Sequence, residues 1–326
     1  MKIHSLFLSN SLRWNIGPSD PITWPAIAEV NASVLNPIAH FDDDQLLSVF
    51  PLIDGRQHVI TNRVHILAAE DIGDHLFDLI QPWLRRLRIA SKQASLPTEA
   101  HGFSIKDFSL SDAKKWTQIS SGRMTIFGEF HINTALDDAA IRLANELGME
   151  ATIPIHYDLL LDALHACEIQ RSRDAILFSA IAIESLAQYE LNKNYEAAVL
   201  AEPPPSHLNI LEFQQPGGQT IKKDPVFSLL TESENFGKLL HEAPLYLMRR
   251  SLLKEFPTLY AKARALYGTR NRLSHGQTVE PNNEKLLQIN QEGASSAAAT
   301  AVAVFDWFGQ SGYYVPDRKM IDAFSP

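Results

Sequence analysis

The sequence predicts an α+β domain in residues 1–150, followed by an all-α helical bundle in residues 151–326. Three observations predict this division. The chain of 326 residues is long enough for two domains, each with its own core. Strand and helix signals are mixed before residue 150, whereas after it the strand signal nearly vanishes and apolar residues recur at helical spacing. A hydrophobic content of 45% with 21% charged residues is typical of a globular protein.

The strand signals of the first half are short. Two runs, Leu47–Ile53 and His58–Leu67, are expected to form a hairpin, because the Asp54-Gly55 pair between them suits a type I′ turn. The other expected strands are Lys2–Leu8, Leu12–Ile16, Gly102–Leu110 and Arg123–Asn133.

Two helices are expected in the same half. The first spans Asp71–Ala90, where Pro82 should kink or break it. Its apolar stripe recurs at helical spacing and consists of Ile72, Leu76, Leu79, Ile80, Trp83 and Leu87. The second spans Leu136–Leu147 and is closed by Gly148.

The second half begins with a helical stripe over Tyr157–Glu168. The next helix, capped by Ser172 with Asp174 in its first turn, is apolar almost all round to Ala187, which predicts burial at the centre of a bundle. A polar connection rich in Pro and Gly, residues 202–218, is expected to be an exposed loop. The later helices are expected at Pro225–Leu240, Tyr246–Leu253, Thr258–Arg272 and Asn283–Phe308. The simplest way to pack these segments is a bundle of four or five antiparallel helices.

The bulk properties exclude several classes of protein. The formal net charge of −9 argues against a protein that coats nucleic acid through its overall charge. No apolar run is long enough to span a membrane, and the first residues lack the apolar core of a signal peptide. The single cysteine, Cys167, fits a cytoplasmic protein and is expected to be a small core residue. No motif for a cofactor or a metal ion is present, so neither is predicted.

One segment reverses the charge balance. Between Pro244 and Gly276 a single acidic residue, Glu255, faces seven cations: Arg249, Arg250, Lys254, Lys262, Arg264, Arg270 and Arg272. Such a segment in an acidic protein indicates a site for phosphates, for which Lys262, Arg264 and Arg272 are the candidate contacts. A solvated helix face is the equally good alternative.

The most informative stretch is Tyr267-Gly-Thr-Arg270-Asn271-Arg-Leu-Ser-His275-Gly276. A histidine titrates near neutral pH and can take a proton from a ribose 2′-OH, and a guanidinium can balance charge growing on a phosphate. Arg270 and His275 therefore suit RNA cleavage without a metal. Helix capping explains the same residues, because cations favour the last turn of a helix and Gly276 suits the position that ends it.

This stretch resembles the R-x4-6-H signature of the HEPN superfamily, in which a polar residue, here Asn271, often follows the arginine. The apolar segment Ile181-Ala-Ile-Glu184-Ser-Leu186 is similar to the helix with an embedded acidic residue that precedes this signature in Apea-like domains. The resemblance covers roughly residues 155–308. It implies a helical domain that cleaves RNA as a homodimer, in a defence or toxin–antitoxin setting with an antitoxin or regulatory partner.

In that activity His275 would handle the 2′-OH proton, Arg270 would stabilise the phosphate, Asn271 would orient one of them, and Glu184 would support the site. The product would be a 2′,3′-cyclic phosphate. Arg270 and His275 are five residues apart, about 140° around an ideal helix, so one regular helix cannot point both at one substrate. Either the last turn is distorted or two chains share the site.

Two alternatives remain open. Glu184 and Arg270 each lie on an apolar helix face, so they are expected to meet inside the bundle, where they would form a structural ion pair. The domain would then be a non-catalytic module for dimerisation or RNA binding.

Overall fold

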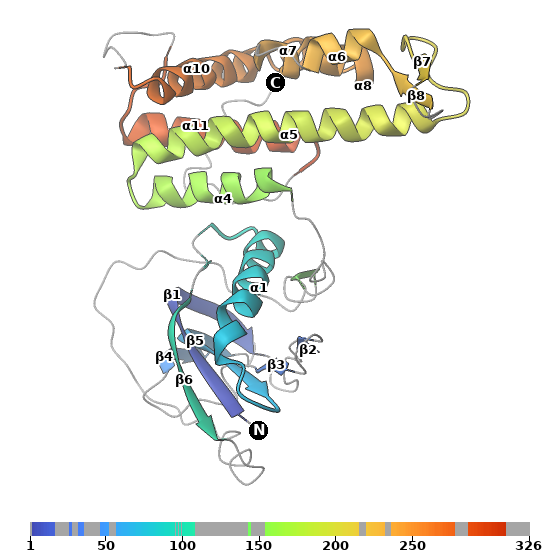
Figure 1. The fold of residues 1–326 in the computed structure, drawn as a ribbon. Helices are drawn as coiled ribbons and strands as arrows, with labels where there is room; N and C mark the ends of the chain where they lie inside the picture. The colour runs from blue at the N-terminus through green and yellow to red at the C-terminus, as the bar shows by residue number, and fades with distance from the viewer. Residues whose placement is uncertain are drawn as a thin grey trace. The chain divides into compact units, whose positions relative to one another are not determined.

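The structure is a computed structural model. It describes residues 2–16, 26–27, 32–35, 46–51, 57–94, 96, 98, 100–107, 143–144, 154–214, 220–231, 236–277 and 286–310. The chain divides into two compact units, Met1–Ile153 and Pro154–Pro326. The first contains an antiparallel sheet with a helix and the second is mostly helical (Figure 1). None of the described helices combines the length and the apolar character needed to cross a membrane.

The sheet of the first unit is antiparallel throughout its described pairs. Its strands are β1 (Lys2–Ile16), β2 (Ala26–Ile27), β3 (Ala32–Leu35), β4 (Leu46–Pro51), β5 (Gln57–Ala68) and β6 (Ala100–Asp107). The order is β2-β3-β5-β1-β6, with β4 paired to another part of β5. The hairpin predicted around Asp54-Gly55 is confirmed by the β4–β5 pairing, although the turn itself lies outside the described residues.

Several predicted boundaries in this unit need correction. The two strands expected before residue 17 form one strand, β1, whose pairing with β5 shifts register between Phe7 and Leu12. The strand predicted at Gly102–Leu110 begins earlier, at Ala100. The strand predicted at Arg123–Asn133 lies outside the described residues, as does most of the helix predicted at Leu136–Leu147, of which residues 143–144 are helical.

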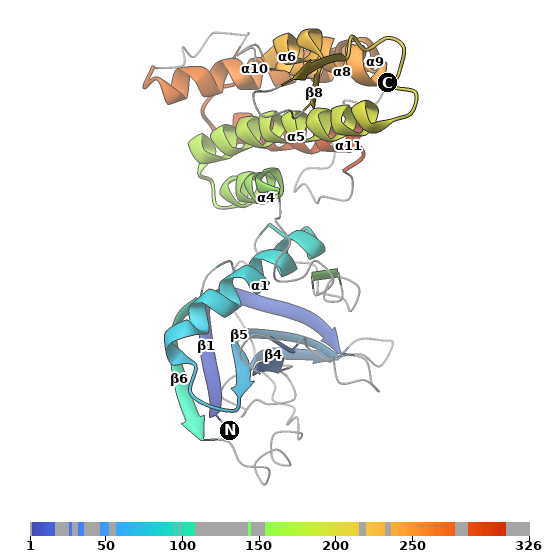
Figure 2. The same ribbon diagram turned by 45° about the vertical axis from the view of Figure 1, so that its right-hand side comes forward.

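Helix α1 (Leu76–Ser91) covers one face of this sheet (Figures 1 and 2). All six residues of its predicted apolar stripe are buried, and they pack against Leu6, Val64 and Ile66 of the central strands. The helix continues through Pro82 and does not break there. Pro82 lies on the exposed side of the helix.

Four long helices form the frame of the second unit: α4 (Ile155–Glu168), α5 (Ser172–Leu200), α10 (Pro257–Ser274) and α11 (Gln291–Trp307). Consecutive long helices run in opposite directions, and α5 and α11 lie between α4 on one side and α10 on the other (Figures 1 and 2). The central burial predicted for α5 is confirmed, because it packs against the three other long helices. Its N-cap is Arg171 rather than the predicted Ser172, and Arg171 forms an ion pair with Asp174 at 2.9 Å.

The predicted exposed loop after α5 contains a strand, β7 (Leu211–Gln214), which pairs antiparallel with β8 (Thr220–Lys223) just after the loop. Buried Asp224 organises this connection. Its carboxylate accepts hydrogen bonds from the Tyr246 hydroxyl at 2.7 Å and from the backbone N–H of Asn209 at 2.8 Å. It also accepts two backbone N–H groups at the start of the next helix, so one carboxylate fixes several segments.

The two helices predicted between residues 225 and 253 are divided into shorter ones. These are α6 (Pro225–Thr231), α7 (Phe236–Leu240), α8 (Glu242–Met248) and α9 (Leu252–Glu255). Helix α11 begins at Gln291, later than the predicted Asn283, because the side chain of Asn290 caps it by accepting the N–H of Gly293 at 2.8 Å. Its alanine-rich run, residues 297–303, is buried.

Candidate functional site

Helix α10 carries the Arg–His motif and packs against α5 and α11. The predicted meeting of Arg270 with Glu184 of α5 is confirmed: Nη2 of Arg270 lies 3.6 Å from Oε2 of Glu184. The predicted burial is wrong, because the two side chains are 27% and 28% exposed. Glu184 follows the fully buried Ile183 by one residue, about 100° around α5, which places it at the margin of the core.

Arg270 is also fixed by its own helix. Its Nη1 donates to Oδ1 of Asn271 at 3.0 Å, and its guanidinium carbon lies 5.5 Å from the ring centroid of Tyr267. The Tyr267 ring stacks on Phe236 with centroids 4.4 Å apart. Carboxylate, amide and aromatic ring together hold the guanidinium in one orientation. Its Nε is buried and has no hydrogen-bond partner within the described part of the chain.

His275 is the C-cap of α10, and its side chain is exposed. Gly276 adopts the left-handed conformation with φ +67°, and its N–H donates to the carbonyl of Leu273 at 3.2 Å. The N–H of Gln277 donates to the carbonyl of Arg272 at 2.8 Å. These two bonds form a Schellman motif, which confirms the prediction that Gly276 ends the helix.

The regularity of α10 bears on the first geometric alternative, a distorted last turn. The backbone N–H of His275 still donates to the carbonyl of Asn271 at 3.1 Å, as in a regular helix, and the left-handed residue comes only after His275. The last turn therefore does not direct the His275 side chain toward the side of α10 that carries Arg270. Within one chain, Arg270 and His275 point to different sides of α10, and no contact joins their side chains among the described residues.

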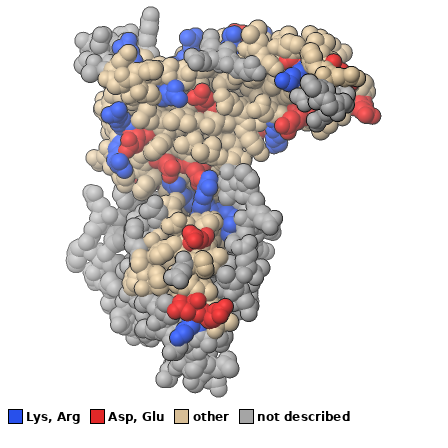
Figure 3. Space-filling view, viewed as in Figure 1, with Lys and Arg blue, Asp and Glu red and all other residues tan. Residues whose placement is uncertain are grey.

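The predicted phosphate contacts lie on the same helix. Lys262 and Arg264 are exposed and Arg272 is partly exposed. Arg264 precedes His275 by eleven residues, about 20° around the helix, and Arg272 precedes it by three, about 60°. Both cations therefore share the side of α10 that carries His275. Figure 3 shows Lys and Arg side chains at the left end of the helical unit, where α10 ends, with acidic side chains beside several of them.

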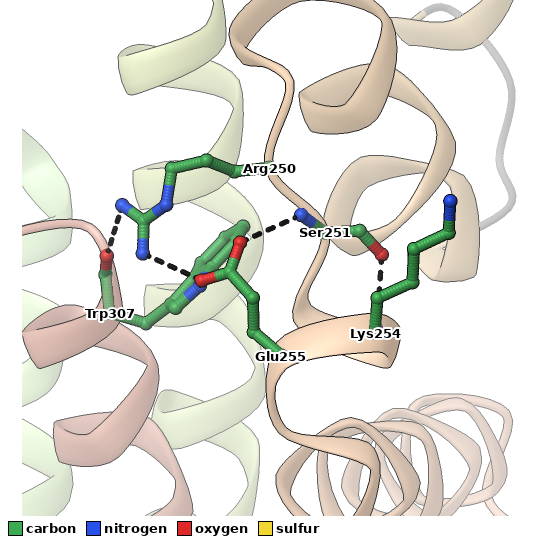
Figure 4. A network of polar contacts seen from close by, with 5 residues as sticks. All are labelled: Arg250, Ser251, Lys254, Glu255 and Trp307. Carbon is green, nitrogen blue, oxygen red and sulfur yellow. Dashed lines mark hydrogen bonds and ion pairs between the residues drawn. The ribbon is translucent and has the colours of Figure 1, made fainter.

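Arg250, by contrast, has a structural role (Figure 4). Its guanidinium donates to Oε2 of Glu255 and to the backbone carbonyl of Trp307, both at 3.0 Å. The indole N–H of Trp307 donates to the same carboxylate at 2.8 Å. Burial alone would raise the pKa of Glu255, but the hydrogen bonds from Arg250, Trp307 and Ser251 outweigh it and the pKa is lowered. This network fastens α9 to the end of α11.

Arg173 of α5 is a residue that sequence reasoning missed. Its Nη2 donates to the carbonyl of Leu273 in the last turn of α10, at 3.4 Å. The two residues are 100 positions apart, so no local pattern indicates the contact. Tyr267 was detectable, because it stands three residues before Arg270 and therefore on the same helix face.

Other chemistry finds little support in the described residues. Cys167 is buried, as predicted, and burial raises the pKa of its thiol. Within the described ranges, no three His, Cys, Asp or Glu side chains are arranged to hold a metal ion. No family model, curated protein or solved structure matches the chain.

Proposed function

We propose that the helical unit is a HEPN-type domain and that the protein is a metal-independent endoribonuclease whose Arg/His site is shared across a homodimer. The observation that carries the proposal is the geometry of α10. Arg270 is oriented by Glu184, Asn271 and Tyr267 on one side of the helix, while His275 is exposed on another. A second copy of α10 would bring its own Arg270 to the first copy's histidine.

The chemistry follows from the two side chains. The neutral imidazole of His275 takes the proton of a ribose 2′-OH, and the 2′-oxygen attacks the adjacent phosphorus. The bond from phosphorus to the 5′-oxygen breaks, and that oxygen takes up a proton from water and leaves as a hydroxyl, while the imidazolium returns its proton to water. The partner chain's copy of the arginine would balance the charge on the phosphate oxygens. The products are a 2′,3′-cyclic phosphate and a 5′-hydroxyl end.

The biological setting is part of the same proposal. A ribonuclease of this type would act in the cytoplasm, in defence or as a toxin held by an antitoxin or another regulatory partner. A partner that covers the exposed histidine would be sufficient to silence it.

A non-catalytic HEPN-like module for dimerisation or RNA binding is the second candidate. It is favoured by the structural roles that the motif residues fill. Arg270 forms the ion pair with Glu184, and the end of α10 is a complete Schellman motif. These contacts are sufficient reason for Arg270 and Gly276 to be present without catalysis.

Cleavage of single-stranded RNA in EDTA tests the proposal. We expect wild-type protein to leave 2′,3′-cyclic phosphate ends and His275→Ala to lose at least about 100-fold in rate, the usual contribution of a general base. His75→Ala, which removes an exposed histidine of the first unit, is the matched control and should keep full activity. RNA binding without cleavage by wild type would favour the non-catalytic module. Undiminished cleavage by His275→Ala would refute the mechanism.

A further inference from the structure

The end of α10 is an unfavourable place for a phosphate. His275 directly follows the last helical residue, Ser274. At this end the helix dipole places the equivalent of about half a negative charge, and the last carbonyl groups point outward. A phosphodiester next to His275 would be repelled unless cations offset this field.

Arg270 cannot supply that cation within the same chain. It lies about 140° around the helix from His275. It is also engaged, because Glu184 holds its Nη2 and Asn271 holds its Nη1. A cation at the end of α10 itself would add to the charge that the partner chain's arginine brings.

Arg173 is placed at this end of the bundle by the fold. Helix α5 begins where α10 ends (Figures 1 and 2). The guanidinium of Arg173 contacts the carbonyl of Leu273, one of the last carbonyls of α10, which point past the helix end where His275 stands. That contact uses one of five N–H donors, and the side chain is exposed. Its neighbour Arg171 is paired with Asp174, whereas no described acidic side chain lies within ion-pair distance of Arg173.

Arg272 adds a second cation. It stands three residues before His275, on the same side of the helix. We propose that Arg173 and Arg272 bind an RNA phosphate beside His275 of the same chain, with Arg173 as the residue that α5 contributes to the site. The inference rests on the proposed function, and it assigns a further cation at the histidine to α5, in addition to the motif arginine that the partner chain would bring.

The matched variants Arg173→Gln and Arg171→Gln test this inference. Each removes one charge from an exposed arginine in or beside the first turn of α5. Binding of a 2′-O-methyl RNA oligonucleotide, which lacks the attacking hydroxyl, is measured against salt concentration, together with KM for cleavable RNA. Losing one phosphate contact should reduce the magnitude of the negative slope of log affinity against log salt by about 0.7. It should also weaken binding about fivefold near 0.1 M salt.

We expect this change, and a matching rise in KM, for Arg173→Gln and not for Arg171→Gln. Arg173→Lys should keep the wild-type slope, because the charge remains. If Arg173 only stabilises the end of α10, Arg173→Gln will lower the melting temperature and leave slope and KM unchanged, which overturns the inference alone. Wild-type protein that neither binds nor cleaves RNA overturns the proposed function and this inference together.

Discussion

At the scale of single residues, His156 shows how burial sets a property that the sequence does not reveal. The ring is buried among Tyr157, Tyr189 and Phe305, with centroids 4.3, 5.0 and 5.9 Å away. Its Nε2 has no hydrogen-bond partner among the described residues. Burial lowers the pKa of His156 to about 4, from an ordinary value of 6.5. The folded protein therefore holds this histidine neutral.

This burial predicts a loss of stability in acid. Because the unfolded chain binds the proton more readily, the full contribution of neutral His156 is present above pH 6.5. It is lost as the pH falls from 6.5 towards 4, by about 3 kcal/mol in total. Urea unfolding of wild type and His156→Phe, followed by circular dichroism between pH 7.5 and pH 4.5, measures the loss. The variant should lose less stability on acidification, whereas His75→Phe should behave as wild type.

Local helix geometry made part of the candidate site predictable. The meeting of Glu184 with Arg270 followed from the helix faces, and the end of α10 followed from Gly276. The partial exposure of the ion pair did not, because a helical stripe does not indicate where the margin of the core lies. The contacts of Arg173 and Asp224 were also missed. Their partners are distant in sequence or belong to the backbone, and residue types alone do not encode them.

At the scale of elements, long periodic segments were predictable and short ones were not. The apolar stripe predicted the position of helix α1, and each residue of the stripe is buried in the core. The strands β7 and β8 were missed because they have four residues each, and every residue of β7 is exposed, so no inward face imposes an alternation. The start of α11 was placed too early because Leu286, Leu287 and Ile289 imitate a helical stripe.

The segment before α11 is instead held by close contacts. The backbone N–H of Leu287 donates to the hydroxyl of Thr269 at 2.8 Å. At Gly293 an added Cβ would overlap the carbonyl oxygen of Gln288, whereas at Gly268 it would meet only a methyl group of Leu286, at 2.9 Å. Both glycines lie in helices, where alanine is intrinsically favoured by about 1 kcal/mol.

The two glycines should therefore respond differently to alanine. Gly293→Ala should destabilise the protein by about 2 kcal/mol, because the backbone of residues 286–290 must move and strain the cap at Asn290. Gly268→Ala should be close to neutral, because the end of the Leu286 side chain can rotate away. Urea unfolding midpoints compare the two. A Gly293→Ala protein as stable as wild type would contradict the close packing of this segment against α11.

At the scale of the whole molecule, the change from mixed signals to helical periodicity predicted an α+β region followed by a helical one. The structure has an antiparallel sheet with a helix and then a mostly helical region. The sequence also left open how Arg270 and His275 could act on one substrate, and the geometry of α10 bears on this question. With His275 on a regular helix end, Arg270 and His275 of one chain do not face one substrate. A symmetric dimer presents each surface twice, so a shared site would occur twice per dimer, each copy built from the arginine of one chain and the histidine of the other.

Mixing two inactive variants tests this arrangement. Arg270→Ala and His275→Ala should each be inactive alone. In a mixed dimer with a shared site, one site carries both substitutions and the other carries none. Random exchange makes about half of the dimers mixed, each with one intact site of two, so activity should return to about a quarter of the wild-type level. If each site lay within one chain, every site would carry one of the two substitutions and no activity would return.

Light scattering at micromolar concentration establishes that the variants form dimers before they are mixed. Subunit exchange is driven by dilution and reconcentration, and a mixture of His275→Ala with wild type is the control for inhibition by the variant subunit. That mixture should lose no activity beyond simple dilution, because each mixed dimer keeps one intact site. Activity that returns only with Arg270→Ala and His275→Ala together would assign the two residues to opposite chains of one site. Dimers that exchange and remain inactive would show that α10 does not form the shared site.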